Sequence, residues 1–231
     1  MKTRTEANRK TLYTVLSVIV CALAMSFVDA VIQPQYFVKS VIKLLLFLVL
    51  PSIYFFVNRG EAGELKKLFL PSRKSLVTAA ALGVAVYAVI VGGYFLLKNI
   101  FDFSGIVGKL TADTGVSADN FLYVALYISF VNSFLEEFLF RGFAFITLKR
   151  TAARPFAYIF SAAMFAIYHA GMTAGYFHIG IFLLTLTALF VAGLMFDFLN
   201  EKSGNIYTSW LVHMFANFGI NTVGMILFGI L

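Results

Sequence analysis

The chain has 231 residues, of which 61% are hydrophobic and only 13% charged, with a net charge of +7. Soluble globular proteins carry about twice that share of charge, so the composition predicts an integral membrane protein. The basic residues lie in short segments between apolar runs, which makes them a topology signal rather than a nucleic-acid surface. The single cysteine, Cys21, excludes an intramolecular disulfide.

Apolar runs long enough to cross a bilayer recur along the whole chain. They predict an all-α, polytopic transmembrane helix bundle that forms a single integral membrane domain over residues 1–231. We expect N-terminal spans within 11–97, a long polar loop at 98–120 and a C-terminal core at 121–231. The predicted spans are 12–32, 41–57, 76–97, 121–148, 155–170, 177–199 and 206–231. Glycines interrupt the last segment, so the prediction is seven to eight spans.

The basic residues are distributed unevenly between the two sides of this bundle. With seven spans, the N-terminal segment and the loops after the second, fourth and sixth spans share one side and hold most of the lysines and arginines. The opposite side holds Lys39, Lys43, Lys98 and Lys109. Loops rich in lysine and arginine stay in the cytoplasm, so the N-terminus is predicted to be cytoplasmic.

The predicted span 121–148 carries two adjacent carboxylates, Glu136 and Glu137, and Arg141 among phenylalanines and leucines. Each charge at that depth costs about 2.5 kcal/mol or more unless it is compensated. Glu137 and Arg141 are four residues apart, so they share a helix face and form a predicted ion pair. Glu136 has no basic residue three or four positions away and is predicted to be unpaired, on a polar face with Asn132. A buried ion pair that only holds the bundle in register is the alternative.

Three further polar residues fall at a similar membrane depth on later spans. At about 1.5 Å per residue, Glu136 and His169 lie about 20 and 21 Å from the cytoplasmic ends of their helices. Asn217 lies about 18 Å and His213 about 12 Å from that side. Similar depths on three helices predict that these four side chains meet inside the bilayer.

Other polar residues of the spans are predicted to lie at the membrane interface. His178 and Asp197 are close to the ends of the sixth span, and Asp29 is close to the end of the first. Asp29 is expected to pair with Lys39 or Lys43. Polar side chains near helix ends reach water, so we do not assign these residues to the site.

Three motifs follow one another on the late spans: Glu136-Glu137-x-x-x-Arg141, Phe165-x-x-x-His169 and His213-x-x-x-Asn217. In this order they resemble the CPBP family of CAAX proteases and bacteriocin-processing or immunity enzymes, also called Abi, over roughly residues 121–218. The resemblance implies an intramembrane glutamic endopeptidase with a polar, water-filled cavity inside a helix bundle.

The resemblance also implies a role for each matched polar residue. Glu136 and His169 would bind and deprotonate the attacking water. His213 and Asn217 would donate hydrogen bonds to the oxyanion of the tetrahedral intermediate. Preset donors of this kind contribute about 3 to 4 kcal/mol each where water is scarce.

Glu137 and Arg141 would organise the site around those four side chains. No cofactor is expected. The expected partners are the lipid bilayer and a peptide or lipidated-peptide substrate, and no nucleic acid. The resemblance and the short N-terminal segment favour a multi-pass protein of a bacterial plasma membrane, which would act on a prenylated CAAX peptide or a secreted leader peptide.

Three alternatives stay open. Glu136, His169 and His213 could hold a zinc ion as a two-histidine, one-carboxylate set, which would make the protein a metalloprotease. The chain could instead be a non-catalytic bacteriocin-immunity or regulatory membrane protein of the same fold. A small transporter could also use mid-membrane carboxylates, but no inverted repeat supports it. Metal-free chemistry is favoured because Asn217 has no place in a zinc shell. The sequence contains neither the zinc-binding motif H-E-x-x-H nor the serine-nucleophile motif G-x-S-x-G, so it does not indicate either of those protease types.

Overall fold

Seven helical segments in the computed structural model are long and apolar enough to cross a membrane. The structure describes residues 2–58, 63, 66–173 and 179–231, and every regular element in these ranges is a helix. The segments are Arg4–Ile32, Tyr36–Val57, Arg73–Leu97, Phe121–Thr151, Arg154–Thr173, Ile179–Ser203 and Tyr207–Leu227. The predicted all-α membrane bundle is confirmed, with seven spans in the part of the chain that the structure describes.

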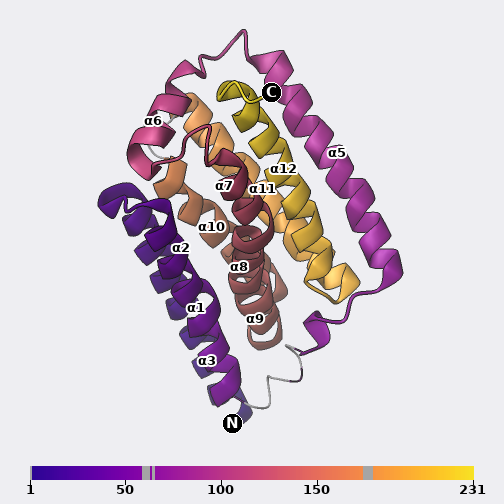
Figure 1. Ribbon diagram of the computed structural model, residues 1–231. Helices are drawn as coiled ribbons and strands as arrows, with labels where there is room; N and C mark the ends of the chain where they lie inside the picture. The colour runs from indigo at the N-terminus through magenta and orange to yellow at the C-terminus, as the bar shows by residue number, and fades with distance from the viewer. Residues whose placement is uncertain (1, 59–62, 64–65, 174–178) are drawn as a thin grey trace.

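Several spans are continuous helices (Figure 1) in which α-helix passes directly into π-helix. In a π-helix each backbone hydrogen bond joins residues that are five positions apart, instead of four as in an α-helix. The α-helices are α1 (Lys2–Phe27), α2 (Tyr36–Leu44), α3 (Leu50–Val57), α5 (Arg73–Leu97), α6 (Ser104–Thr114), α7 (Phe121–Tyr127), α8 (Ser133–Glu137), α9 (Ile146–Thr151), α10 (Arg154–Thr173), α11 (Ile179–Ser203) and α12 (Tyr207–Leu227). The π-helical stretches are η1 (Val28–Ile32), η2 (Leu45–Val49), η3 (Ile128–Asn132) and η4 (Phe138–Phe145).

The fourth span alternates between the two helix types along its length. Its short helix α8, which carries Glu136 and Glu137, lies between the π-helical stretches η3 and η4. Inserted π-turns are uncommon and are found mostly at functional sites, because each one changes the direction of the side chains that follow. The glutamates therefore occupy the most irregular part of the longest span.

This fourth span lies at the centre of the bundle (Figure 1), and all residues of η4 are buried. The helix α10 packs against both α1 and α11, whereas α12 packs along α5. Small residues allow these helices to approach closely. A Cβ added at Gly193 of α11 would lie 2.8 Å from Cα of Ala162 in α10, and one added at Gly171 would lie 2.6 Å from the carbonyl oxygen of Ser26 in α1.

The segment 98–120 differs from the prediction of a loop, because it contains the helix α6, Ser104–Thr114. This helix ends at Gly115, whose φ of 71° is the left-handed conformation that terminates helices. Two glycines, Gly105 and Gly108, weaken its helix propensity, which explains why the sequence pattern hides it. The helix α1 begins at Lys2, ten residues before the predicted first span 12–32, so the basic N-terminal segment is helical as well.

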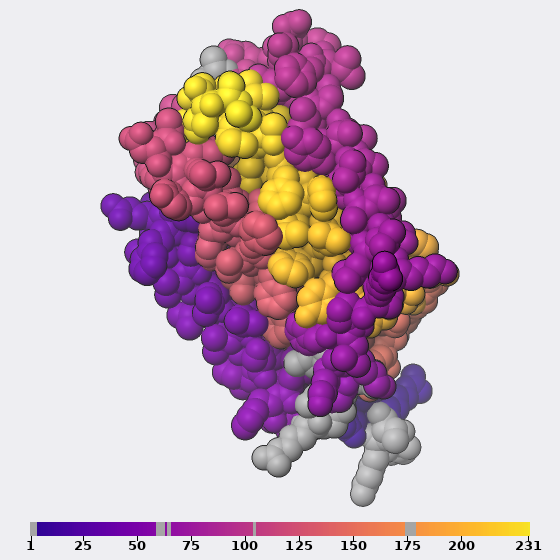
Figure 2. Space-filling model, turned by 45° about the vertical axis from the view of Figure 1, so that its right-hand side comes forward, coloured from indigo at the N-terminus to yellow at the C-terminus, as the bar shows by residue number. Residues whose placement is uncertain are grey.

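Large apolar side chains cover the outside of the bundle. On one face of α1, Leu16, Val20, Leu23 and Phe27 are each more than half exposed. Figure 2 shows another outer face, on which α5 lies alongside α12. Contiguous apolar surface of this extent is typical of contact with lipid, which agrees with a multi-pass membrane protein.

Candidate active site

Glu136 of α8 is the centre of a buried polar cluster. Its side chain is 1% exposed, and its Oε1 atom accepts hydrogen bonds from Lys43 Nζ at 2.5 Å and from Asn132 Nδ2 at 2.9 Å. The hydroxyl of Tyr168 donates to the same oxygen at 3.3 Å. The second oxygen, Oε2, is buried and has no hydrogen-bond partner among the residues that the structure describes. One side of the carboxylate is therefore fixed, and the other is available.

Two imidazole rings face the available oxygen of Glu136. The Nε2 atoms of His169 in α10 and His213 in α12 each lie 3.6 Å from Oε2. The Nδ1 atom of His169 lies 2.7 Å from the carbonyl oxygen of Phe165, which can only accept, so Nδ1 carries the proton. The helices α8, α10 and α12 thus bring together three of the four residues that were predicted to meet.

Glu137 contacts the other side of His213. Its Oε1 atom lies 3.0 Å from Nδ1 of His213 and 3.4 Å from a guanidinium nitrogen of Arg141. The predicted pair of Glu137 and Arg141 is present, and both side chains are fully buried. The hydrogen bond from His213 to Glu137 links the first and third motifs, a contact that the sequence spacing did not predict.

Arg141 also contacts Asp197 of α11, at 3.4 Å between Nε and Oδ1. The prediction that Asp197 lies at the membrane interface is wrong, because its side chain is fully buried and accepts a hydrogen bond from Ser161 at 2.9 Å. The close approach of α10 and α11 at Gly193 brings the residue into the interior. His178, for which the same prediction was made, lies outside the described residues.

Lys43 of α2 corrects a second prediction, since Glu136 does have a cationic partner. The lysine is 2% exposed and its ammonium group also contacts Asn132 and the Tyr168 hydroxyl. Spacing along one helix could not reveal it, because the two residues are 93 positions apart on different helices. Asp29 pairs with Lys39, one of its two expected partners, and is also buried.

Asn217 donates its hydrogen bond to a group outside the carboxylate cluster. Its amide nitrogen donates to the carbonyl oxygen of Ile128 at 3.1 Å, and Asn221, one turn further along α12, donates to that of Ala125 at 3.1 Å. Both carbonyls lie where the fourth span changes from α- to π-helix. The oxyanion role expected for Asn217 therefore stays a prediction.

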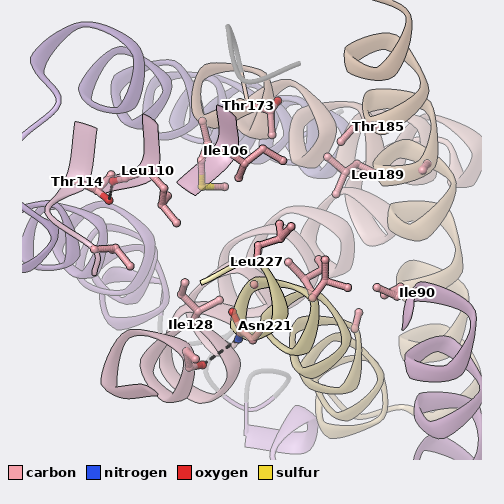
Figure 3. Close-up of a pocket in the computed structure, with 18 of the residues that line it drawn as sticks. Ile90, Ile106, Leu110, Thr114, Ile128, Thr173, Thr185, Leu189, Asn221 and Leu227 are labelled. Carbon is pink, nitrogen blue, oxygen red and sulfur yellow. Dashed lines mark hydrogen bonds between the residues drawn. The ribbon is translucent and has the colours of Figure 1, made fainter. Parts of the chain in front are cut away.

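A cavity of about 850 Å³ lies beside the cluster and is lined by residues of α5, α6, α10, α11 and α12 (Figure 3). Its walls are mainly apolar, and Ile128, Leu110 and Leu227 line it. Phe196 belongs to the wall and stacks on the ring of His213, with 5.2 Å between the centroids. The ring of Phe196 therefore stands between the cavity and one imidazole of the cluster.

Three side chains of the cluster are of the types that bind zinc. Glu136, His169 and His213 present one carboxylate oxygen and two imidazole nitrogens to each other, as the zinc alternative requires. Among the described residues, however, no group of three or more His, Cys, Asp or Glu side chains has the geometry of a metal site. Lys43 also places an ammonium group on the same carboxylate, and a second cation there would be repelled.

Residues 118–219 match the family model described as type II CAAX prenyl endopeptidase Rce1-like. This part of the chain is similar to the Rce1-like family. The match covers less than half of the chain and includes all three motifs, so the resemblance to CAAX proteases is confirmed there. At the level of the family, it supports a CAAX-type protease of the membrane. No match was found among curated proteins or among solved structures.

Proposed function

We propose that the protein is an intramembrane endopeptidase that hydrolyses a peptide bond of a membrane-associated peptide with water activated by Glu136 and His169. The observation that carries this proposal is the Oε2 atom of Glu136. It is a buried carboxylate oxygen without a hydrogen-bond partner, 3.6 Å from two imidazole nitrogens. Leaving such an atom unsatisfied costs about 1 to 3 kcal/mol, which favours a functional explanation.

The tautomer of His169 supports the role of a water-binding pair. Because Nδ1 of the neutral ring donates to Phe165, Nε2 is an acceptor, as is Oε2 of Glu136. A water molecule donates two hydrogen bonds and would satisfy both acceptors at once. Glu136 would then take one proton while the water oxygen bonds to the carbonyl carbon, and would return that proton to the leaving amine.

His213 is suited to stabilise the oxyanion when it carries protons on both nitrogens. Its Nδ1–H would donate to Glu137, 3.0 Å away, and the carboxylate would stabilise the positive ring. Its Nε2–H would then be free to donate to the oxyanion. The amide of Asn217 has a second N–H besides the one that Ile128 accepts, and this N–H is the donor required of it.

The cavity favours a substrate with a long apolar part. Its volume of about 850 Å³ and mainly apolar walls suit a prenyl chain or an apolar peptide segment. Phe196 stands between this space and the ring of His213, so a chain in the cavity would lie one aromatic ring away from the reacting groups. A lipidated or apolar membrane peptide is the substrate class that we propose for this multi-pass protein.

A second candidate function is a membrane protein that binds such a peptide without cleaving it. The pairing of Glu136 with Lys43 favours this reading, because a fully compensated charge can serve stability alone. The two functions predict different results for one substitution. A binding protein would keep its cellular effect after Glu136→Gln, whereas a protease would lose it.

The test compares wild-type protein with Glu136→Gln in lipid vesicles. The probe is a farnesylated peptide that ends in a CAAX sequence and carries a fluorophore and a quencher on either side of the scissile bond. We expect Glu136→Gln to lower kcat at least about a thousandfold. A general base contributes about a hundredfold to ten-thousandfold to the rate, and this substitution removes the base entirely. The matched control is Glu201→Gln, which removes a carboxylate paired with Arg154 at the end of the bundle and is expected to keep wild-type kcat.

Cleavage by Glu136→Gln at the wild-type rate would refute the proposal. Mass spectrometry of membrane peptides from cells with either form extends the test beyond prenylated substrates. Peptides that accumulate only with Glu136→Gln would support the protease function. A peptide population that is the same in both, together with an inert probe, would favour the binding protein.

A further inference from the structure

Lys43 is a buried cation that the matched motifs do not include. It lies in α2, outside residues 118–219, and is 2% exposed. Its ammonium group donates to Oε1 of Glu136 at 2.5 Å, to the hydroxyl of Tyr168 at 2.5 Å and to the amide oxygen of Asn132. The rings of Phe47 and Tyr168 lie 5.2 and 4.7 Å from it. Each of its three hydrogens therefore has an acceptor, which is what a lysine at this depth requires.

The contacts of Lys43 divide the carboxylate of Glu136 into two unlike oxygens. Oε1 accepts from Lys43, Asn132 and Tyr168, whereas Oε2 accepts from no group in the described part of the chain. A carboxylate fixed by several donors on one oxygen cannot rotate freely about its last bond. Its second oxygen is then held toward the two imidazoles. A displacement of about 1 Å at such a position can cost about a hundredfold in rate.

We propose that Lys43 is a positioning residue of the Glu136 site, which holds Oε1 so that Oε2 points at the attacking water. This inference rests on the proposed function and adds a residue from the N-terminal spans to it. Lys43 does not touch the substrate or the reacting atoms. It acts through Glu136, and Asn132 and Tyr168 act with it.

The first test measures kcat and KM of Lys43→Met on the farnesylated CAAX peptide in vesicles. We expect kcat to fall about a hundredfold and KM to change by less than threefold, because orientation of Glu136 affects the reaction and not binding. Lys149→Met is the matched control, since it removes a lysine paired with Glu201 outside the site and is expected to keep wild-type kcat. A kcat of Lys43→Met within twofold of wild type, or a loss in KM alone, would overturn the inference.

Tyr168→Phe gives a second test, which removes no charge, and circular dichroism of the variant checks its helix content. It deletes a hydroxyl that contacts both Lys43 and Glu136, and we expect kcat to fall about tenfold at unchanged KM. Chemical rescue separates positioning from a structural role. Propylammonium added to Lys43→Ala is expected to restore kcat at least tenfold, whereas propanol is expected to restore none. Equal kcat for Tyr168→Phe and wild type would count against the inference.

A stability cycle tests the contact without any substrate. Lys43→Met leaves Glu136 buried without its cation, so we expect a lower midpoint of thermal unfolding in micelles. In the Glu136→Gln background the same change is expected to lower it less, because no charge is left unpaired. Equal losses in both backgrounds would overturn the inference. Wild-type protein that cleaves nothing would instead refute the proposed function, and the two failures are therefore distinguishable.

Discussion

Glu137 and His213 form a hydrogen bond of 3.0 Å between Oε1 and Nδ1, while the other nitrogen of the same ring faces Glu136 at 3.6 Å. Two adjacent glutamates of α8 thus contact the two nitrogens of one imidazole. Adjacent helix residues point about 100° apart, so only a ring that approaches between them can do this. His213 approaches in this way because α12 packs directly against α8.

This geometry predicts the effect of Glu137→Gln. The amide of glutamine still accepts from Nδ1 of His213, but it no longer stabilises the positive ring. If the ring donates to the oxyanion as an imidazolium, kcat on the farnesylated CAAX peptide will fall about a hundredfold at nearly constant KM. Steady-state kinetics of purified protein in vesicles measure both constants.

The control for Glu137→Gln is again Glu201→Gln, because it removes a carboxylate from an arginine pair outside the site. We expect circular dichroism to show that both variants keep the helix content of the wild-type protein. If Glu137→Gln cleaves the peptide at the wild-type rate, the charge of Glu137 has no part in the reaction.

Asp197 is predicted to matter for stability. Its carboxylate faces Arg141, which is fully buried and has Glu137 as its other anionic partner. Asp197→Asn keeps the contact with Ser161 but removes one of the two negative charges around the guanidinium. We expect the free energy of unfolding to fall by about 3 kcal/mol, at the lower end for a broken buried pair. Unfolding of the protein in detergent micelles, followed by circular dichroism, measures the change.

Asp119→Asn is the control for this prediction, since Asp119 is exposed. Its free energy of unfolding is expected to change by less than about 0.5 kcal/mol. An Asp197→Asn variant as stable as Asp119→Asn would mean that Glu137 alone compensates Arg141.

The sequence predicts the bundle well because membrane spans are set by local composition. Runs of apolar residues and the pattern of basic loops need no knowledge of distant contacts, and the seven spans follow from them. Similar depth also indicates that Glu136, His169 and His213 can meet. Whether they do meet depends on how each of the three helices is rotated about its own axis. Spacing along the chain gives the depth of a residue in the membrane but not the direction in which its helix faces.

The two wrong predictions about the site share a physical cause. Lys43 and Asp197 both lie near the ends of apolar runs, where a charged side chain usually reaches water. Their burial depends on partners from other helices, Glu136 for the lysine and Arg141 for the aspartate. No periodicity within one helix carries that information. The sequence gives one indication of such a partner. No basic residue lies three or four positions from Glu136, so its cation has to come from another helix.

Removal of metal ions separates the metal-free mechanism from the zinc alternative. The ammonium of Lys43 already compensates Glu136, and the described residues hold no group with metal-site geometry. We therefore expect kcat on the farnesylated CAAX peptide to stay within twofold after treatment with 1,10-phenanthroline. Elemental analysis of the purified protein is expected to give far less than one zinc per chain. Stoichiometric zinc, together with activity that is lost in chelator and returns with added zinc, would establish the metalloprotease.

The contact between α1 and α10 gives a prediction about how the N-terminal spans support the site. A Cβ added at Gly171 would lie 2.6 Å from the carbonyl oxygen of Ser26, a distance that real side chains do not tolerate. Gly171→Ala must therefore move α1 away from α10, and the hydrogen bond from Ser26 to the Tyr168 carbonyl oxygen lies at the same place. Such overpacking costs about 1 to 3 kcal/mol of unfolding free energy.

Because Gly171 is two residues from His169, the same shift would displace the imidazole from Glu136. We expect Gly171→Ala to lower kcat about tenfold as well as the unfolding midpoint. Gly92→Ala is the matched control, since a Cβ at Gly92 of α5 meets no atom within 4 Å. Alanine favours a helix over glycine by about 1 kcal/mol, so this variant is expected to be at least as stable as wild type and fully active. If Gly171→Ala behaves like Gly92→Ala, then α1 and α10 do not depend on this close approach, and the first span does not hold His169 in place.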